Sequence, residues 1–555
     1  MKDAARDAAQ HIDELRAKEE EELAVVLSQK YGIDYIDLTR VTINTDALRL
    51  IKEPLAREAE VAAFDVAGKK LKLAVRSPQQ PHLHKVLAEL EKGNYVVEQF
   101  MVSRVSLEAA WERYKDLSFA IETKEGVFDI SSKELLETIA AFKSIADVAT
   151  AIAGVQELKK AYRISRILEV VLAGALATGA SDIHVEPEEG SVRMRYRLDG
   201  VLNDAVSFDE ETYHLLLSRI KLLSGLKLNV RDRAQDGRFS IELKGSDIEI
   251  RTSVIPGSYG ENIVMRVLNP ENIAVSFEGL GMEPALERLV LDEITKPNGM
   301  LLTTGPTGSG KTTTLYACLR KIHTPNIKII TIEDPIEYHL PGIVQTQVEK
   351  EYTFIGALRS ALRQDPDVLM VGEIRDADVA RTAIDSALTG HFVFSTLHTN
   401  NAAGAFPRLA DFNIDLKVAG SAVSVVLAQR LVRKLCPQCK KEVVLSGEIK
   451  ESIDRVVAGI RNREVVPANT EKVFEPVGCI ACNNTGYKGR IGIFEGIVVD
   501  KEIDQFIRNN PSENDIQEIQ RKRPLLTMPE DGVVKILNGI TSLEELTRVV
   551  SLDEG

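Results

Sequence analysis

Long hydrophobic runs, aromatic residues and cysteines are all scarce in this chain of 555 residues. Aromatic residues make up 5% of it, and no apolar run reaches the ~18 residues that span a bilayer. The nearest approach, residues 164–180, is interrupted by Arg166 and Glu169. The opening segment, residues 1–22, is polar and lacks the apolar region of a signal peptide. We therefore predict a cytoplasmic protein that reaches a membrane only through partners.

An excess of basic residues is missing as well. The chain has 69 Lys and Arg against 83 Asp and Glu, which gives a net charge of −14. Proteins that grip nucleic acid usually carry a basic balance or a basic stripe, so the charge disfavours a DNA or RNA motor. Hydrophobic residues at 44% and charged residues at 27% are typical of soluble globular proteins. The length favours three or four domains.

Four of the five cysteines form two Cys-x-x-Cys pairs, Cys436 with Cys439 and Cys479 with Cys482. In a reducing compartment this pattern favours a metal over disulfides, and four thiolates suit tetrahedral Zn²⁺. The long gap between the pairs is tolerable because loop-closure entropy rises slowly with length. Two unrelated turns are the alternative; redox chemistry is less favoured because neither pair opens a thioredoxin-like helix. The fifth, Cys318, is predicted to be a core residue.

Hydrophobic patterns divide the chain into regions of different character. Residues 193–198 alternate arginine with apolar residues, which predicts a strand with one basic face, and Asp199-Gly200 predicts a hairpin turn. Residues 240–254 predict a second hairpin that turns at 244–247. The predicted regions are a small α/β domain (1–116, opened by a charged helix over 1–22), a helical linker without a clear core (117–159), an α+β domain (160–278), a parallel α/β core (279–430), a tetracysteine module (431–496) and a helical C-terminal region (497–555).

A phosphate-binding loop follows the apolar strand at residues 300–304. Residues 305–312, GPTGSGKT, match G-x-x-x-x-G-K-[ST] and open a helix, which is the context that this motif needs. Its glycines let backbone N–H groups surround phosphates, Lys311 reaches the β- and γ-phosphates, and the Thr312 hydroxyl binds Mg²⁺. A glycine-rich turn without a ligand is the disfavoured alternative. The predicted nucleotide-binding residues are Gly305, Pro306, Thr307, Gly308, Ser309, Gly310, Lys311, Thr312 and Thr313.

Acidic residues end two further apolar strands. One strand ends in Glu373, a Walker B arrangement that would act on Mg²⁺ or its water. Another ends in Glu333 and Asp334, with Glu337 just beyond a proline. Ligands bind at the carboxyl edge of such sheets, where one carboxylate can orient or deprotonate an attacking water. The spacing does not decide which acid is the base, and Glu333 and Asp334 could instead form a solvated turn.

Four motifs in fixed order, GPTGSGKT, TIEDPIEY, RQDPDVLMVGEIRD and TGHFVFSTLHTN, resemble the type II secretion and type IV pilus ATPase family, the GspE/PilB group. The resemblance runs from about Ala161 to the C-terminus. It implies a RecA-like P-loop NTPase domain preceded by a PAS-like α+β domain. It also implies a homohexamer that hydrolyses ATP with Mg²⁺ to drive pilus extension or pseudopilus assembly.

The resemblance assigns roles to residues outside the P-loop. Glu337 takes the place of the catalytic glutamate and Glu373 that of the Walker B acid, although the two roles could be exchanged. His391 and His398 take the places of histidines that sense the γ-phosphate. From composition alone, a histidine at a strand end is more often a simple hydrogen-bonding residue.

Two arginines of the preceding domain, Arg251 and Arg266, fit family positions that reach the nucleotide. Gly260 and Glu261 match the glycine-glutamate pair of the family. A guanidinium on the transferring phosphoryl stabilises its spread charge. Strand-surface salt bridges of little energetic weight are the alternative for both arginines.

The partners follow from the resemblance. It implies an inner-membrane platform protein at the centre of the ring and a cytoplasmic recruitment protein held by the N-terminal domain, with no nucleic acid. The tetracysteine module favours assembly or export over a retraction or DNA-uptake motor, and intact catalytic positions disfavour a scaffold that only binds nucleotide. A repeated Arg-Leu-Gly motif for cyclic di-GMP is not found in residues 1–116, which disfavours control by that messenger.

Overall fold

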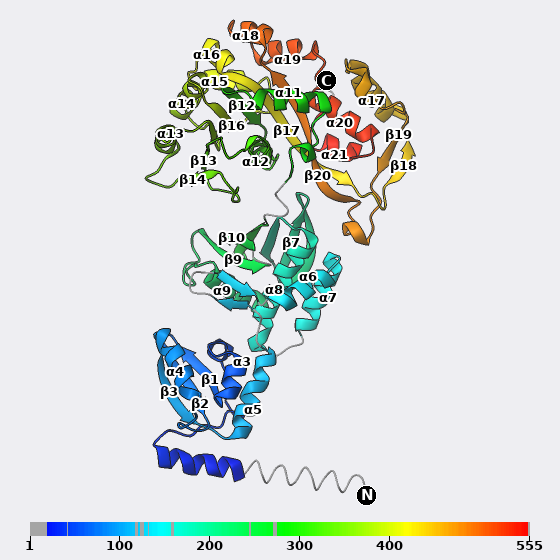
Figure 1. Cartoon of the computed structure of the whole chain (residues 1–555). Coiled ribbons are helices and arrows are strands. Elements are labelled where there is room, and N and C mark those ends of the chain that lie inside the picture. Colours follow the sequence, from blue (N-terminus) through cyan, green and yellow to red (C-terminus); the bar gives the residue numbers. More distant parts are fainter. Residues whose placement is uncertain are drawn as a thin grey trace.

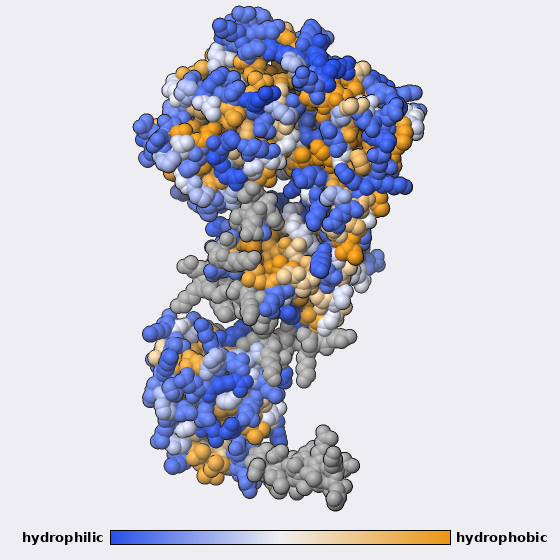
Figure 2. Space-filling model, turned by 45° about the vertical axis from the view of Figure 1, so that its right-hand side comes forward, coloured by the Kyte–Doolittle hydropathy of each residue, from blue (hydrophilic) through white to orange (hydrophobic). Residues whose placement is uncertain are grey.

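The computed structural model of the chain describes residues 19–552 except 42, 117–119, 123–126, 131, 157–159, 244–245 and 270–274. An N-terminal domain, a middle domain and a large C-terminal domain follow one another along the length of the molecule (Figure 1). Hydrophilic residues prevail on the faces of the N- and C-terminal domains drawn in Figure 2. Within the described ranges, none of the helices combines the length and the apolar character needed to cross a bilayer. Most of the charged helix predicted over 1–22 lies outside these ranges, and a helix is seen over 19–31.

The N-terminal domain packs short helices on a three-stranded sheet. Strands β1 and β2 are antiparallel, whereas β2 and β3 are parallel, and Leu71, Leu73 and Val75 of β2 are fully buried. The strands predicted near 69–75 and 94–102 are both present. The elements are α2 (Thr45–Arg49), α3 (Glu53–Glu58), β1 (Val61–Ala67), β2 (Lys70–Val75), α4 (Leu83–Lys92), β3 (Val96–Met101), α5 (Arg104–Glu112) and η1 (Arg113–Asp116).

In the middle domain, helices pack on an eight-stranded sheet with the strand order β4-β5-β9-β10-β11-β6-β7-β8. The predicted alternation in β7 is confirmed, because Val192, Met194 and Tyr196 are buried while the intervening arginines are not. The turn of the second predicted hairpin, at 244–245, lies outside the described residues. The elements are β4 (Ala120–Glu122), β5 (Val127–Ile130), α6 (Ser132–Ala141), α7 (Ile145–Gln156), α8 (Lys160–Thr178), β6 (Asp182–Glu188), β7 (Ser191–Leu198), β8 (Val201–Phe208), α9 (Glu210–Leu223), β9 (Gln235–Leu243), β10 (Ser246–Gly257) and β11 (Gly260–Leu268).

The region predicted as a helical linker without a core belongs instead to the middle domain. Its strand β5 pairs in parallel with β9, and Val148 and Ile152 of α7 are fully buried in the same core as α8. These apolar residues recur at helical spacing among small and charged ones, so a short amphipathic helix buries them. The prediction of a coreless linker over 117–159 is therefore wrong.

The C-terminal domain is built on a seven-stranded sheet in the order β14-β13-β15-β16-β12-β17-β20. The predicted parallel pairing is found for all its strands except β20, which runs antiparallel to β17. Figure 1 shows helices on both faces of this sheet. The elements are η2 (Glu278–Leu280), α11 (Pro284–Ile294), β12 (Gly299–Thr304), α12 (Lys311–Ile322), β13 (Ile329–Glu333), β14 (Val344–Gln347), α13 (Phe354–Leu362), β15 (Val368–Val371), α14 (Ala377–Leu388), β16 (Phe392–Leu397), α15 (Ala405–Asp411), α16 (Leu416–Ala422), β17 (Val423–Leu435) and β20 (Tyr487–Val498).

The tetracysteine module is inserted between β17 and β20. The predicted boundary at 430/431 therefore falls inside β17. The C-terminal helices return to the same core, where Ile503, Ile516 and Leu546 are buried. The sheet therefore extends further along the chain than predicted. The remaining elements are β18 (Lys441–Val444), α17 (Gly447–Gly459), η3 (Arg463–Val465), β19 (Lys472–Glu475), η4 (Ile480–Cys482), α18 (Lys501–Ile507), α19 (Glu513–Arg521), α20 (Met528–Leu537) and α21 (Leu543–Thr547).

Candidate active site and metal centre

A cleft of about 980 Å³ separates the middle domain from the carboxyl edge of the C-terminal sheet. Residues 306–313 of the predicted phosphate loop line it, and Gly305 joins that loop to β12. Asp182, His184, Arg197 and Arg266 line it from the middle domain. A ligand in this cleft would touch both domains at once.

The glycines of the loop allow it to approach β17 closely. Gly305 and Gly310 have φ values of +144° and +91°, which side chains rarely adopt. A Cβ on Gly305 would lie 2.6 Å from the carbonyl oxygen of Gln429, and one on Gly310 would lie 2.8 Å from the Gln429 Nε2. Helix α12 begins at Lys311, so its N-terminus, with unpaired N–H groups and a partial positive charge, faces the cleft.

Polar groups in the loop have the character that a phosphate requires. The Lys311 Nζ donates to the carbonyl oxygens of Gly305 at 2.8 Å and Pro306 at 3.1 Å, and burial lowers the Lys311 pKa. The buried Ser309 Oγ has no hydrogen-bond partner in the part of the chain that the structure describes. An ammonium that donates to neutral carbonyls and a buried hydroxyl without a partner among the described residues both fit an incoming anion.

Glu333 is held in the core rather than in the cleft solvent. It is 2% exposed and accepts hydrogen bonds from Tyr316, from Thr331 at 2.5 Å and from Gln345 at 3.1 Å. Burial raises the pKa of its carboxyl group. The alternative of a solvated turn therefore does not apply to Glu333, although Asp334 beside it is exposed.

Glu373 follows β15 and lines the cleft together with the phosphate loop. Its carboxylate contacts the Arg375 guanidinium and lies 3.4 Å from the His398 Nε2. Thr312 lines the same cleft. A hydroxyl and a carboxylate are oxygen ligands that suit Mg²⁺, so these two residues fit the predicted role.

Arg251 joins the two domains at Glu337. Its Nη1 donates to the Glu337 Oε2 at 3.2 Å and its Nη2 donates to the Ile336 carbonyl at 2.6 Å, while its Nε donates to Glu249 at 2.7 Å. A purely local salt bridge on the strand surface is therefore excluded for Arg251. Arg266 lines the cleft, and its Nε donates to Asp182 at 3.1 Å within its own domain.

The two predicted histidines lie at opposite edges of the sheet. His398 follows β16 at the cleft edge. His391 precedes β16, and its Nδ1 lies 3.1 Å from the Ser386 carbonyl oxygen. Its own carbonyl accepts a hydrogen bond from the Gly299 N–H at the start of β12, so it lies at the end of β12 away from the phosphate loop. A six-residue strand separates the two by roughly 20 Å. The predicted contact with the γ-phosphate is thus wrong for His391 within one chain.

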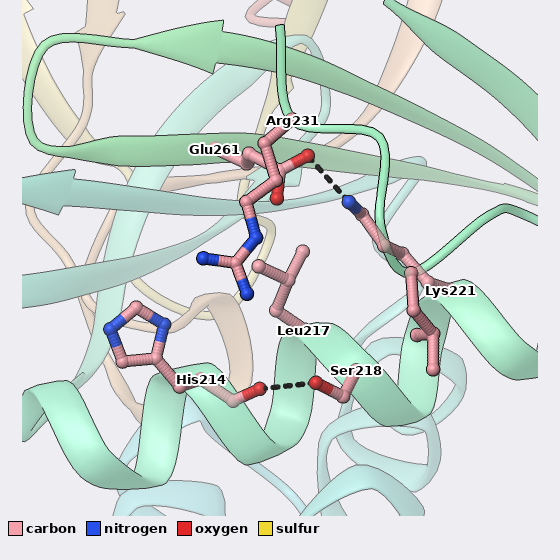
Figure 3. Close-up of a pocket in the computed structure, with 7 residues that line it drawn as sticks. His214, Leu217, Ser218, Lys221, Arg231 and Glu261 are labelled. Carbon is pink, nitrogen blue, oxygen red and sulfur yellow. Dashed lines mark hydrogen bonds and ion pairs between the residues drawn. The ribbon is translucent and has the colours of Figure 1, made fainter.

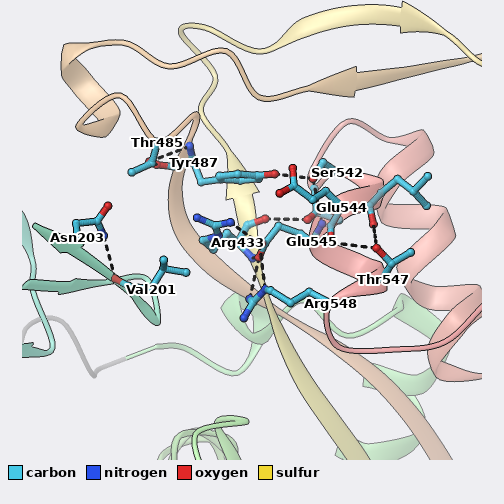
Figure 4. Close-up of polar contacts among 12 residues, drawn as sticks. Val201, Asn203, Arg433, Thr485, Tyr487, Ser542, Glu544, Glu545, Thr547 and Arg548 are labelled. Atoms are coloured by element: carbon cyan, nitrogen blue, oxygen red, sulfur yellow. Dashed lines mark hydrogen bonds and ion pairs between the residues drawn. The ribbon is translucent and has the colours of Figure 1, made fainter.

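Several arginines of the cleft were missed. Arg375 bridges Glu373 and Asp334, and Arg430 donates to the Asn400 carbonyl at 3.0 Å, with its pKa lowered by burial. Arg548 also lines the cleft, and Figure 4 shows it converging with Arg433 on the buried Glu545. Arg375 could have been found because it lies two residues after the strand-end acid Glu373, whereas the sequence shows no comparable pattern for Arg430 or Arg548.

A smaller pocket of about 160 Å³ lies beside α9 and explains the glycine-glutamate pair (Figure 3). Glu261 forms a 2.6 Å ion pair with Lys221, and both side chains are almost fully buried. The Lys221 Nζ also donates to the Val230 carbonyl at 2.9 Å. Glu261 therefore ties β11 to α9 and does not line the cleft.

The four paired cysteines come together, which excludes two unrelated turns. Their Sγ atoms lie within 4.8 Å of one another, and three of the pairs are separated by 3.7, 3.8 and 3.9 Å. A tetrahedral Zn²⁺ with Zn–S bonds of ~2.3 Å sets Sγ–Sγ distances of about 3.8 Å. Burial alone would raise the pKa of Cys482, but N–H groups of Cys479 and Gly486 that donate to its Sγ lower the pKa to about 7. The cluster therefore fits zinc.

The sequence matches two known families. Residues 157–548 match the family described as "Type II/IV secretion system protein", and residues 31–120 match the "MshEN domain". The first match covers more than half of the chain and includes the cleft, the P-loop and the tetracysteine module.

Similar proteins agree with the first of these matches. The "Type II secretion system protein E" of Aeromonas hydrophila is 43% identical over 392 residues, which are 70% of this chain and 76% of that protein. The "Type IV pilus assembly ATPase PilB" of Thermus thermophilus is 36% identical over 531 residues, which are 95% of this chain and 57% of that longer protein. The solved ATPase DotB of Yersinia pseudotuberculosis covers 69% of this chain and 92% of its own, with a TM-score of 0.52 and 20% identity, and shows a shared fold.

Proposed function

The chain belongs to the type II/IV secretion system protein family, and from this premise we propose that it is an ATPase that powers type IV pilus extension or type II pseudopilus assembly. The observation that supports this most is the contact of Arg251 with Glu337 across the cleft that the P-loop lines. A nucleotide bound there meets charged groups from two domains. Its hydrolysis can therefore change how those domains are held together.

The residues of the cleft divide the chemistry between them. Backbone N–H groups of residues 307–313 and the Lys311 ammonium hold the β- and γ-phosphates. Thr312 and Glu373 would hold Mg²⁺, which would supply positive charge to neutralise the phosphate oxygens. Glu337 orients the attacking water and takes its proton as the bond to the terminal phosphoryl breaks.

The arginines of the middle domain stabilise the charge that develops on the transferred group. Arg251 already lies at the Glu337 carboxylate, to which its Nη1 donates at 3.2 Å. Arg266 faces the same cleft. ATP binding draws the middle domain toward the P-loop, and the release of phosphate removes the charge that holds it there.

We propose that six such subunits form a ring in the cytoplasm and act on an inner-membrane platform protein, with the N-terminal domain held by a cytoplasmic recruitment protein. Membrane association at the inner face then comes from these partners. Nucleic acid has no place in this scheme, in line with the net charge of −14.

Phosphate release tests the catalytic part of the proposal. The protein with Mg²⁺ and ATP is compared with Lys311→Ala and with Lys321→Ala, a control on the last turn of the same helix. We expect Lys311→Ala to lose about 10²–10³-fold in rate, because it removes a charge placed on the phosphates, and the control to keep the wild-type rate. A Lys311→Ala rate equal to wild type would contradict the proposal.

Gene deletion tests the biological part. Loss of an assembly motor should leave cells without pili or without secreted substrates, and complementation with the wild-type gene, but not with Lys311→Ala, should restore them. A retraction motor would give the opposite result, because filaments that are not withdrawn accumulate.

A further inference from the structure

The tetracysteine module touches the middle domain at the N-terminus of α7. The N–H groups of Lys143 and Ser144 donate to Asp147 in the same turn. The next N–H group, of Ile145, donates at 2.8 Å to the side-chain Oδ1 of Asn483, far away in the sequence. An asparagine oxygen is among the best acceptors for the free N–H groups at a helix start. Here it is supplied by a different domain.

The metal cluster determines where Asn483 lies. Asn483 directly follows Cys482 and has a left-handed φ of +51°. Its own N–H donates to the Ile480 carbonyl at 3.2 Å, and the Cys482 N–H donates to the Cys479 carbonyl at 3.1 Å. The backbone on which Asn483 sits is therefore fixed by the two cysteines that would bind the metal.

Helix α7 transmits this contact into the wall of the cleft. Val148 of α7 packs so closely on α8 that a Cβ on Gly174 would lie 2.6 Å from it. Both helices share one core with the sheet whose strands β10 and β11 carry Arg251 and Arg266. A shift at the start of α7 is thus a shift of the arginine-bearing domain, since tightly packed elements move together.

A second contact lies on the same side of the molecule. The Gly489 N–H, at the start of β20, donates at 2.8 Å to the Asp199 Oδ2 on the β7–β8 turn. Asp199 itself lines the cleft. The segment that follows the cysteines therefore contacts the middle domain at Ile145 and at Asp199. The hydrogen bond of Arg251 to Glu337 is a third contact between the two domains.

We propose that Asn483 is a positioning residue for the ATPase reaction: it couples the metal-bound tetracysteine knuckle to α7 and so holds Arg251 and Arg266 over the P-loop. This inference rests on the proposed function of the cleft. The proposal gives the metal a role beyond local folding, because the ion would fix the asparagine that caps helix α7 of the middle domain.

The experiment compares Asn483→Ala with Asn484→Ala in the full-length, zinc-loaded protein. Asn484 is a matched control because it is exposed and has a similar φ of +60°. Hydrogen–deuterium exchange is measured on a peptide spanning residues 143–152. We expect about fivefold faster exchange at the start of α7 in Asn483→Ala, the effect of losing one helix cap, with zinc content unchanged and no change in the control. Removing zinc by chelation should produce the same increase in the wild type and none beyond it in Asn483→Ala.

The link to catalysis is tested in a second background. Asn483→Ala should raise the KM for ATP by a larger factor in the wild type than in Arg251→Ala, because only Arg266 is then left for it to position. Unchanged exchange in Asn483→Ala, an equal effect of Asn484→Ala, or an undiminished KM effect in Arg251→Ala would each overturn the proposal. The exchange result does not depend on turnover, so an inactive wild type would refute the proposed function and leave the coupling separately testable.

Discussion

Two ion pairs of similar chemistry differ in place: one lies inside the middle domain, and the other joins that domain to the C-terminal domain. In the pocket beside α9, Lys221 and Glu261 are 2% and 7% exposed; at the cleft, Arg251 and Glu337 are 25% and 34% exposed. A buried pair cannot be opened without leaving an unsatisfied charge in the core, whereas a half-exposed pair can exchange its partner for water or a phosphate. The first pair therefore stabilises the domain, and the second is suited to move during a reaction.

The largest expected effect is on the reactive member of the exposed pair. Glu337→Gln removes the proton acceptor and keeps its shape, so we expect kcat for ATP hydrolysis to fall about 10²–10⁴-fold. The free energy of unfolding should be unchanged. The matched control is Glu349→Gln, an exposed position between β14 and α13. If Glu337→Gln hydrolysed ATP normally while Glu373→Gln did not, the roles of the two acids would be exchanged.

The buried pair should show the reverse behaviour. Lys221→Met leaves the Glu261 carboxylate without a counter-ion in the core, so we expect the free energy of unfolding to fall by about 3–5 kcal/mol. Denaturant unfolding followed by circular dichroism measures it. The double variant Lys221→Met with Glu261→Leu should recover most of the loss, because it removes both charges. A single variant as stable as the wild type would show that the two pairs do not differ as proposed.

A smaller effect separates charge from geometry at Arg251. Arg251→Lys keeps the charge but cannot donate to both Glu337 and the Ile336 carbonyl, so we expect about a tenfold loss of ATPase rate. Because the pair is half exposed, the unfolding free energy should change by less than about 1 kcal/mol. Equal losses of rate and stability would place Arg251 in the same class as Lys221.

The sequence predicted the parts of this molecule that are governed by local patterns. The P-loop, the strand-end acids and the cysteine pairs depend on short motifs in fixed strand or loop contexts, and the structure brings each set together. What could not be predicted depends on contacts between distant segments. The Asn483 cap on α7 and the partner of Glu261 are examples, because neither residue type reveals its partner. His391 failed for a different reason: the apolar run 392–397 already separates it from His398 by a strand, and only the family resemblance assigned both histidines to the phosphate.

Glu333 extends the comparison to a buried carboxyl group for which no counter-ion is seen among the described residues. It accepts from the neutral groups of Tyr316, Thr331 and Gln345, and burial raises its pKa in the folded state. The folded protein therefore binds a proton more tightly than the unfolded chain does. The contribution of Glu333 to the free energy of unfolding is complete below the pKa of a glutamate in the unfolded chain, about 4.3. It is lost as the pH rises through the raised pKa of Glu333 in the folded state.

Glu333→Gln should abolish this part of the pH dependence, because an amide cannot titrate, and should leave the protein more stable than the wild type above that window. Unfolding free energies of both proteins, measured from pH 4 upward, give the two slopes directly. Parallel curves would mean that the folded and unfolded states bind the Glu333 proton equally, so that folding does not raise its pKa. In that case the neutral donors alone would compensate its burial, and Glu333 would belong with the exposed acids of the cleft rather than with the Lys221–Glu261 pair.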